Sequence, residues 1–182
     1  MKILLIRHAD PDYEADSLTP QGWKEARLLA ERISAMDICK FYVSPLGRAK
    51  DTASLTLQKM QRQAQECLWL REFAPLIRRP DQQKPSIVWD WLPQDWTAVK
   101  AFYEKDAWMH QEAMVQGEVA AEYQWVTKSL DQVLAEHGYV RENHYYHAAR
   151  SNMDTIAFFC HFGLECVLLS HLLGVSPMVL WH

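Results

Sequence analysis

Three short apolar runs constrain the fold of this chain more than any other feature. Residues 2–6, 41–43 and 155–160 are rich in β-branched or aromatic side chains, and a segment with helix signals follows each of them. Such runs are typical of strands that are buried on both faces of a sheet. Strands that alternate with helices predict an α/β fold, here a three-layer α/β/α sandwich with a mostly parallel central sheet.

Helix signals stand between and after these strands. The expected helices cover residues 20–33, 45–61, 119–134 and 164–173. Thr19 is placed to cap the first helix, which has Pro20 in its first turn, and Ser44 is placed to cap the second. Residues 75–95 hold four prolines and little periodicity, so we expect an extended excursion there, and we expect a hairpin over residues 139–147.

The composition narrows the choice of partners. The 182 residues fit one domain, and with a net charge of −4 and no long block of Lys or Arg, a nucleic-acid or anionic-membrane surface is not expected. None of the four cysteines forms a C-x-x-C pair, so free thiols in a reducing compartment are expected. The first apolar run ends at Arg7 and is too short for a signal peptide or a membrane span. We therefore expect a soluble, cytoplasmic protein.

Cationic or titratable residues follow all three expected strands. The first strand leads into Arg7 and His8, the second into a segment that carries Arg48, and the third into His161. Because ligands of open α/β sheets bind at the carboxyl ends of the strands, these side chains are expected to meet. Two arginines and two histidines predict a pocket for a doubly charged anion. The other six histidines are assigned to the surface or the core by default.

The position of Arg48 supports the same prediction. It lies in the first turn of the expected second helix, where the helix dipole and the unpaired N–H groups disfavour a cation. An anion at that helix end relieves the conflict and uses the same N–H groups. A solvated arginine on a helix face is the alternative, and the expected proximity of Arg7 and His8 favours the anion.

A metal site is the competing interpretation of the histidines, because histidine is a common zinc ligand. The arginines next to them repel a cation, and the chain has no H-E-x-x-H or C-x-x-C spacing. We therefore expect neither a metal nor a cofactor.

Four segments match a known pattern in order and spacing. Residues 5–9 read L-I-R-H-A, residues 18–22 read L-T-P-Q-G, residues 44–49 read S-P-L-G-R-A and residues 160–163 read C-H-F-G. These segments resemble the R-H-G, L-T-x-x-G, S-x-L-x-R-A and H-G-G segments of the histidine phosphatase superfamily, which includes the cofactor-dependent phosphoglycerate mutases. The resemblance covers about residues 1–73 and 150–175, with Ala9 in place of the usual glycine and Phe162 within the last segment.

The resemblance implies a mechanism and a set of site residues. His8 is the implied nucleophile, which carries the phosphoryl group as a phosphohistidine. Arg7, Arg48 and His161 are the implied ligands of the phosphoryl oxygens. Glu72 stands some two dozen residues after Arg48, where the family has its proton donor. The implied catalytic residues are thus His8, Glu72 and His161.

The stretch after Glu72 separates the possible reactions. It lacks the glycine-tryptophan-glutamate pattern that is common in the mutases and in many of the small phosphatases. Its absence argues against a mutase and leaves Asp10 and Glu14 as reserve acids. The leading prediction is a metal-independent phosphomonoesterase that acts on a small organic phosphate. A phosphoglycerate mutase and a non-catalytic phospho-ligand-binding protein are the alternatives. A homodimer is left open.

Residues 75–150 form an insert that is rich in Trp and Tyr. Such side chains fill cores and also line ligand pockets. One interpretation is that some of them cover the active site and accept an organic leaving group. The alternative is that they pack the insert itself.

Overall fold

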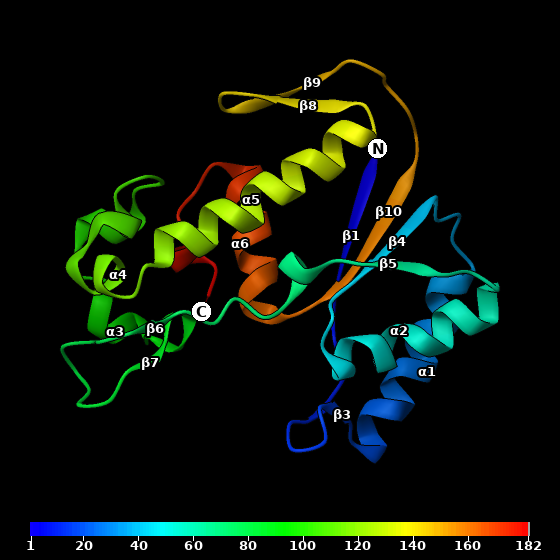
Figure 1. Ribbon diagram of the computed structural model, residues 1–182, viewed down its shortest axis with the longest axis horizontal. Coiled ribbons are helices and arrows are strands. Elements are labelled where there is room, and N and C mark those ends of the chain that lie inside the picture. Colours follow the sequence, from blue (N-terminus) through cyan, green and yellow to red (C-terminus); the bar gives the residue numbers. More distant parts are fainter. Residues whose placement is uncertain (182) are drawn as a thin grey trace. The chain divides into compact units, whose positions relative to one another are not determined.

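The computed structural model describes residues 1–181, and His182, one of the histidines assigned by default, lies outside the described residues. The chain forms two compact units and passes through each of them twice (Figure 1). We call residues 1–72 and 151–161 the sheet unit, and residues 73–150 and 162–181 the helical unit. Within the described residues, every helix is too short or too polar to cross a lipid bilayer.

The sheet unit consists of a parallel sheet and two long helices. Its elements are β1 (Lys2–Arg7), β2 (Pro11–Asp12), β3 (Ser17–Leu18), α1 (Pro20–Ser34), β4 (Lys40–Val43), α2 (Gly47–Met60), β5 (Ala64–Glu66), a 3₁₀ turn (Leu68–Leu70) and β10 (Thr155–Cys160). The strand order is β1-β10-β4-β5, and all neighbours are parallel (Figure 1). The expected α/β class and its parallel sheet are confirmed.

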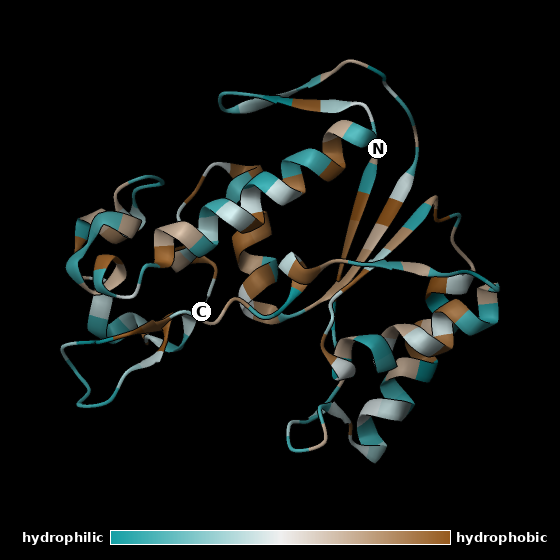
Figure 2. Cartoon of the chain, viewed as in Figure 1, coloured by the Kyte–Doolittle hydropathy of each residue, from teal (hydrophilic) through white to brown (hydrophobic). Residues whose placement is uncertain are grey.

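Apolar side chains hold α1 and α2 against this sheet. Figure 2 shows hydrophobic residues along its strands. One buried cluster joins Ile6, Phe41 and Phe159 of the strands to Ile33 of α1 and Ala53 of α2. Burial of each large apolar side chain contributes about 1.5–3 kcal/mol, so this cluster fixes the helices that follow β1 and β4.

The two helix starts differ from each other. Thr19 caps α1 as expected, because its hydroxyl accepts a hydrogen bond from a first-turn N–H group. The prediction that Ser44 caps α2 is wrong: Leu46 stands at the cap position and makes no side-chain hydrogen bond there. The N–H group of Ser44 donates to the carbonyl of Phe159 at 2.9 Å, so the hydrogen bonding of the sheet continues one residue past β4.

The helical unit is built around two long helices and a hairpin. Its elements are β6 (Leu76–Ile77), β7 (Ser86–Ile87), α3 (Pro93–Trp96), α4 (Glu112–Gln116), α5 (Val119–Glu136), β8 (Tyr139–Glu142), β9 (Tyr145–Ala148), α6 (Phe162–Leu173) and 3₁₀ turns at Val88–Asp90, Lys100–Tyr103, Trp108–His110 and Pro177–Val179. Helices α5 and α6 and the hairpin are confirmed. The extended excursion at 75–95 is only partly right, because β6 pairs with β7 and Pro93 begins α3.

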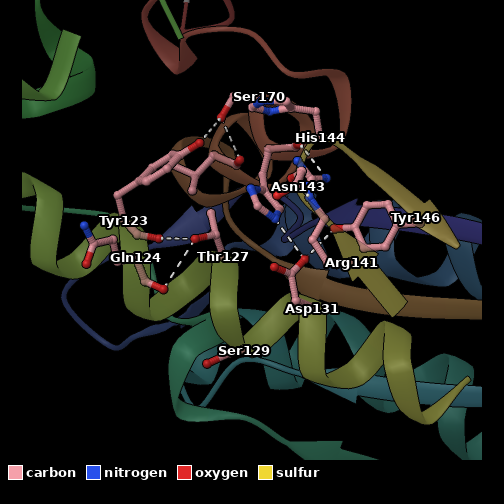
Figure 3. Close-up of polar contacts among 12 residues, drawn as sticks. Tyr123, Gln124, Thr127, Ser129, Asp131, Arg141, Asn143, His144, Tyr146 and Ser170 are labelled. Atoms are coloured by element: carbon pink, nitrogen blue, oxygen red, sulfur yellow. Dashed lines mark hydrogen bonds and ion pairs between the residues drawn. The ribbon is translucent and has the colours of Figure 1, made fainter. Parts of the chain in front are cut away.

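A polar network ties the hairpin to α5 and α6 (Figure 3). Asp131 of α5 accepts a hydrogen bond from the Tyr146 hydroxyl at 2.5 Å, and its carboxylate lies 2.8 Å from Nε2 of His171. The Arg141 guanidinium lies 4.8 Å from the centre of the Tyr146 ring. Burial and the bond to Asp131 raise the pKa of Tyr146 well above its usual value. The Tyr146 hydroxyl therefore stays protonated and keeps donating to the carboxylate.

Aromatic side chains of the helical unit pack against one another. Trp108 meets Trp181 edge-on at 5.8 Å between ring centres, and Trp91 meets Phe102 in the same way at 5.2 Å. All four side chains are buried. Edge-to-face pairs of this kind contribute about 0.5–1.5 kcal/mol beyond area burial, so these residues serve packing within their own unit.

Candidate active site

His8 stands at the carboxyl end of β1, next to the end of β10. Its N–H group donates to the carbonyl of Cys160 at 3.0 Å, so the residue continues the sheet ladder. The residue is 6% exposed, and its Nδ1 lies 2.8 Å from the carbonyl oxygen of Ala9. A carbonyl can only accept, so Nδ1 carries the hydrogen and Nε2 is left with a lone pair. This tautomer is the one that a nucleophilic histidine requires, because the lone pair of Nε2 is available for attack.

His161 follows β10 and lies beside His8. The two ring centres are 5.2 Å apart, with the planes tilted by 55°. Nε2 of His161 is 2.7 Å from the Ser44 hydroxyl, which already accepts a hydrogen bond from the N–H group of Leu46. Ser44 is therefore free to donate to Nε2, and Nδ1 then carries the hydrogen. That Nδ1 is buried and has no partner among the described residues, so it is suited to donate to an anionic ligand.

Both histidines are electrically neutral near pH 7. Burial is the main cause that lowers the pKa of His8, and the charges of Arg48 and Arg7 lower it further, against the opposing effects of the bond to Ala9 and of Asp16. Burial and then the charge of Arg48 lower the pKa of His161 to about 3. The positive charge of the site is therefore carried by arginine.

The anion expected at the N-terminus of α2 is supplied by the chain itself. One carboxylate oxygen of Asp16 accepts from the N–H group of Gly47 at 2.7 Å, and the other accepts from Nη1 of Arg48 at 2.7 Å. Nε of Arg48 is buried without a hydrogen-bond partner among residues 1–181. The guanidinium thus has one fixed partner and further N–H groups for a ligand.

Thr52 connects the loop after His8 to the helix that carries Arg48. Its hydroxyl accepts from the N–H group of Ala9 at 3.0 Å and donates to the carbonyl of Arg48 at 2.7 Å. The residue is fully buried. Ala9 is accommodated within this network.

The remaining predicted residues lie around this centre. Arg7 ends β1 and is exposed, and its charge acts on both histidines. Glu72 is partly buried in the segment that leaves the carboxyl end of β5, after the 3₁₀ turn. Of the reserve acids, Asp10 accepts a hydrogen bond from the Thr19 hydroxyl at 2.5 Å, which commits its carboxylate to the start of α1, and Glu14 is exposed.

A small cavity adjoins one side of His8. It measures about 230 Å³, and its walls come from β1, the following loop and α1: Arg7, His8, Ala9, Asp10, Pro11 and Glu25. Glu25 accepts a hydrogen bond from the N–H group of Asp10 at 2.9 Å. Sequence reasoning missed Glu25, because its contact with the loop depends on how α1 packs.

The charges around His8 and His161 fit an anion better than a metal ion. Arg7 and Arg48 place two permanent positive charges near both rings, and Arg48 already engages Asp16. A cation bound between the rings would meet these charges at close range. A phosphoryl group would meet neutral N–H donors and two guanidinium groups, which are its usual ligands.

Comparison with known proteins covers the whole chain. Residues 3–182 match the family model of the histidine phosphatase superfamily (branch 1). No curated protein sequence matches. The mycobacterial glucosyl-3-phosphoglycerate phosphatase is 16% identical, with a TM-score of 0.59 over 98% of this chain and 82% of that chain.

Two further solved structures share the fold. The alpha-ribazole phosphatase from Shigella flexneri is 21% identical, with a TM-score of 0.58 over 100% of this chain and 84% of that chain. The phosphoserine phosphatase from Entamoeba histolytica, in complex with 3-phosphoglyceric acid, is 18% identical, with a TM-score of 0.57 over 97% of this chain and 82% of that chain. These likenesses concern the fold, whereas the family model matches the sequence from the first strand onward. With that match over nearly its whole length, the chain belongs to branch 1 of the histidine phosphatase superfamily.

Proposed function

We propose that this protein is a phosphomonoesterase that hydrolyses a small organic phosphate through a phosphohistidine on His8. The observation that carries the proposal is the state of the His8 ring: Nδ1 is held by the Ala9 carbonyl at 2.8 Å, and the lowered pKa keeps Nε2 unprotonated. Family membership supports the same reaction class.

The first step transfers the phosphoryl group to the protein. Nε2 of His8 attacks phosphorus in line, and the bond from phosphorus to the ester oxygen breaks. Arg7, Arg48 and His161 bind the phosphoryl oxygens, so that charge in the loose transition state is met by fixed donors. Glu72 donates a proton to the departing alkoxide, which leaves as an alcohol.

The second step releases phosphate. Glu72, now a carboxylate, takes a proton from a water molecule that attacks the phosphohistidine, and the nitrogen–phosphorus bond breaks. The products are inorganic phosphate and a neutral His8, and Glu72 is protonated again. The cycle needs no metal and no cofactor, and we place it in the cytoplasm.

The proposed substrate class is supported by chemistry that the names of the neighbouring structures share. Their names describe phosphatases of a ribazole phosphate, a glucosyl phosphoglycerate and phosphoserine, each a phosphate ester of a small hydroxyl compound. We propose an ester of that kind here.

The test is hydrolysis of p-nitrophenyl phosphate in the presence of EDTA, with release of inorganic phosphate as the readout. The wild type, His8→Ala and His147→Ala are compared; His147 is an exposed histidine of β9 and serves as the matched control. We expect turnover that survives EDTA, disappears in His8→Ala and persists in His147→Ala. EDTA-sensitive turnover that His8→Ala leaves intact would overturn the proposal.

A further inference from the structure

The loop between β1 and α1 approaches α2 unusually closely at one residue. Asp16 has a φ of 47°, the left-handed region, which costs a non-glycine residue roughly 1–2 kcal/mol. Its carbonyl oxygen lies only 2.0 Å from where a Cβ at position 47 would stand, so only Gly47 permits this approach. Strained backbone of this kind persists when the surrounding contacts require it, and it points to a function.

The carboxylate of Asp16 accepts hydrogen bonds from two groups that have no other hydrogen-bond acceptor among residues 1–181. Helix α2 has no side-chain cap and no acidic residue in its first turn, so its first N–H groups need an acceptor from elsewhere. Asp16 accepts from Gly47 and, through its other oxygen, from Nη1 of Arg48. Although burial works in the opposite direction, these hydrogen bonds hold the pKa of Asp16 below its usual value.

Stability alone does not explain the pair. The Asp16 side chain is 43% exposed, and ion pairs with that much solvent contribute little to folding. Its geometric effect is larger, because the Arg48 side chain is only 12% exposed and has no other hydrogen-bond acceptor among the described residues. The guanidinium carbon of Arg48 also lies over the Tyr13 ring, 5.4 Å from the ring centre.

We propose that Asp16 is a positioning residue that orients Arg48 for the phosphoryl group, an inference that rests on the proposed phosphatase function. Asp16 does not contact the substrate. It takes one N–H group of the guanidinium and leaves the others to bind phosphoryl oxygens. The alternative is that the Asp16 carboxylate competes with phosphate for Arg48. The experiment below distinguishes these two roles.

The experiment compares Asp16→Asn with Asp12→Asn. Asp12 lies in the same loop, and within the described part of the chain its carboxylate accepts only from the N–H groups of Glu14 and Ala15. We expect Asp16→Asn to lower kcat/KM roughly 10- to 100-fold, because small misplacements of a catalytic group have effects of that order. We expect the affinity for orthovanadate, measured by isothermal titration calorimetry, to fall as well. Asp12→Asn should stay within about twofold in both, because an exposed substitution has small effects.

A double-mutant cycle shows whether Asp16 acts through Arg48. In an Arg48→Ala background, Asp16→Asn should change kcat/KM by less than about threefold, because its target is absent. The pH profile adds a second readout. Arg7 of β1, Arg48 of α2 and the loop residue Asp16 act on His8, and Asp16 alone of these raises its pKa. The acid limb of kcat/KM should therefore move to lower pH in Asp16→Asn, which loss of a purely structural contact would not cause.

Three outcomes overturn the inference: equal losses from Asp16→Asn with and without Arg48, unchanged vanadate affinity, or tighter vanadate binding, the last of which identifies a competitor. If the wild type binds vanadate but does not release phosphate, the proposed function fails separately, and the calorimetric comparison still decides the role of Asp16. Melting temperatures of all variants identify any that do not fold.

Discussion

The two units of this protein differ in how much of their structure a short stretch of sequence can predict. In the sheet unit, a few residues at strand ends define the site: Arg7 ends β1, His8 follows it, and His161 follows β10 in matching register. In the helical unit, buried aromatic rings and the network around Asp131 define the structure, and no local sequence motif predicts these contacts. A local pattern thus identifies chemistry, whereas packing over many residues is visible only after folding.

This difference implies a division of labour that can be tested. Substitutions in the sheet unit should change turnover more than stability, and substitutions in the helical network should do the reverse. A variant that breaks this rule would show that the two units share the chemistry.

The largest effect is expected from Arg48→Ala. We expect kcat/KM to fall by about 10²–10³, the range for loss of a charged transition-state donor. Because the charge of Arg48 lowers the pKa of His8, the acid limb of the pH profile should also move to higher pH. Steady-state kinetics from pH 5 to 8, roughly the range in which histidine titrates, measure both effects. Arg32→Ala, at an exposed arginine of α1, is the control and should leave both unchanged.

The next effect compares two glycines, one from each unit. Gly47→Ala places a methyl group against the Asp16 carbonyl, so we expect roughly a tenfold loss of kcat/KM as Arg48 shifts. At Gly174, φ is 71° but, apart from its chain neighbours, no described residue has an atom within 4 Å of the point where a Cβ would stand. Gly174→Ala should therefore cost about 1 kcal/mol of stability and leave turnover intact. Similar turnover in the two variants would argue against the Asp16 contact as a determinant of the site.

Asp131→Asn probes the helical unit directly. The substitution weakens the acceptor for Tyr146 and His171, so the free energy of unfolding should fall by about 1–3 kcal/mol. The rate of phosphate release at about 25 °C should stay within about threefold of the wild-type rate. Urea denaturation followed by circular dichroism measures the stability, with exposed Asp95→Asn of the same unit as the control. A loss of turnover without a loss of stability would break the division between the units.

The smallest effect is a pH response of the wild type. His8 attacks only when Nε2 is unprotonated, and its pKa lies below the ordinary value of 6.5. Lowering the pH to 6.5 should therefore reduce kcat/KM by less than twofold, whereas an unperturbed histidine would lose about half of its active form there. An acid limb at or above pH 6.5 would show that burial and the arginines do not keep this ring neutral.

The sequence predicted β1, β4 and β10, the long helices and the strand-end residues because those signals are local, whereas the edge strand β5 was not predicted. Thr19 and Pro20 mark a helix start within two residues, and the apolar run of β10 needs no distant partner to be recognised. The misassigned cap shows the limit. Ser44 looks like a helix cap, yet its hydroxyl accepts from the N–H group of Leu46, before α2 begins, and also bonds to His161, 117 residues away.

The contact between Asp16 and Arg48 could not be predicted from the sequence for a related reason. Its bond to Arg48 joins residues 32 positions apart, and its backbone adopts a conformation that the sequence of a polar loop does not predict. The available signal was indirect: a cation in the first turn of α2 without an acidic neighbour requires an anion from elsewhere. That reasoning predicted the charge but not its source.

The uneven distribution of tryptophan makes intrinsic fluorescence a probe of one of the two units. Six of its eight tryptophans belong to the helical unit, and Trp181 is held there by stacking on Phe73 and by a hydrogen bond from its indole to Gly163 at 3.3 Å. Intrinsic fluorescence therefore reports mainly on the helical unit, while release of phosphate reports on the sheet unit. Recording emission and residual turnover along one heating ramp would show, without any added dye, whether the two units melt together.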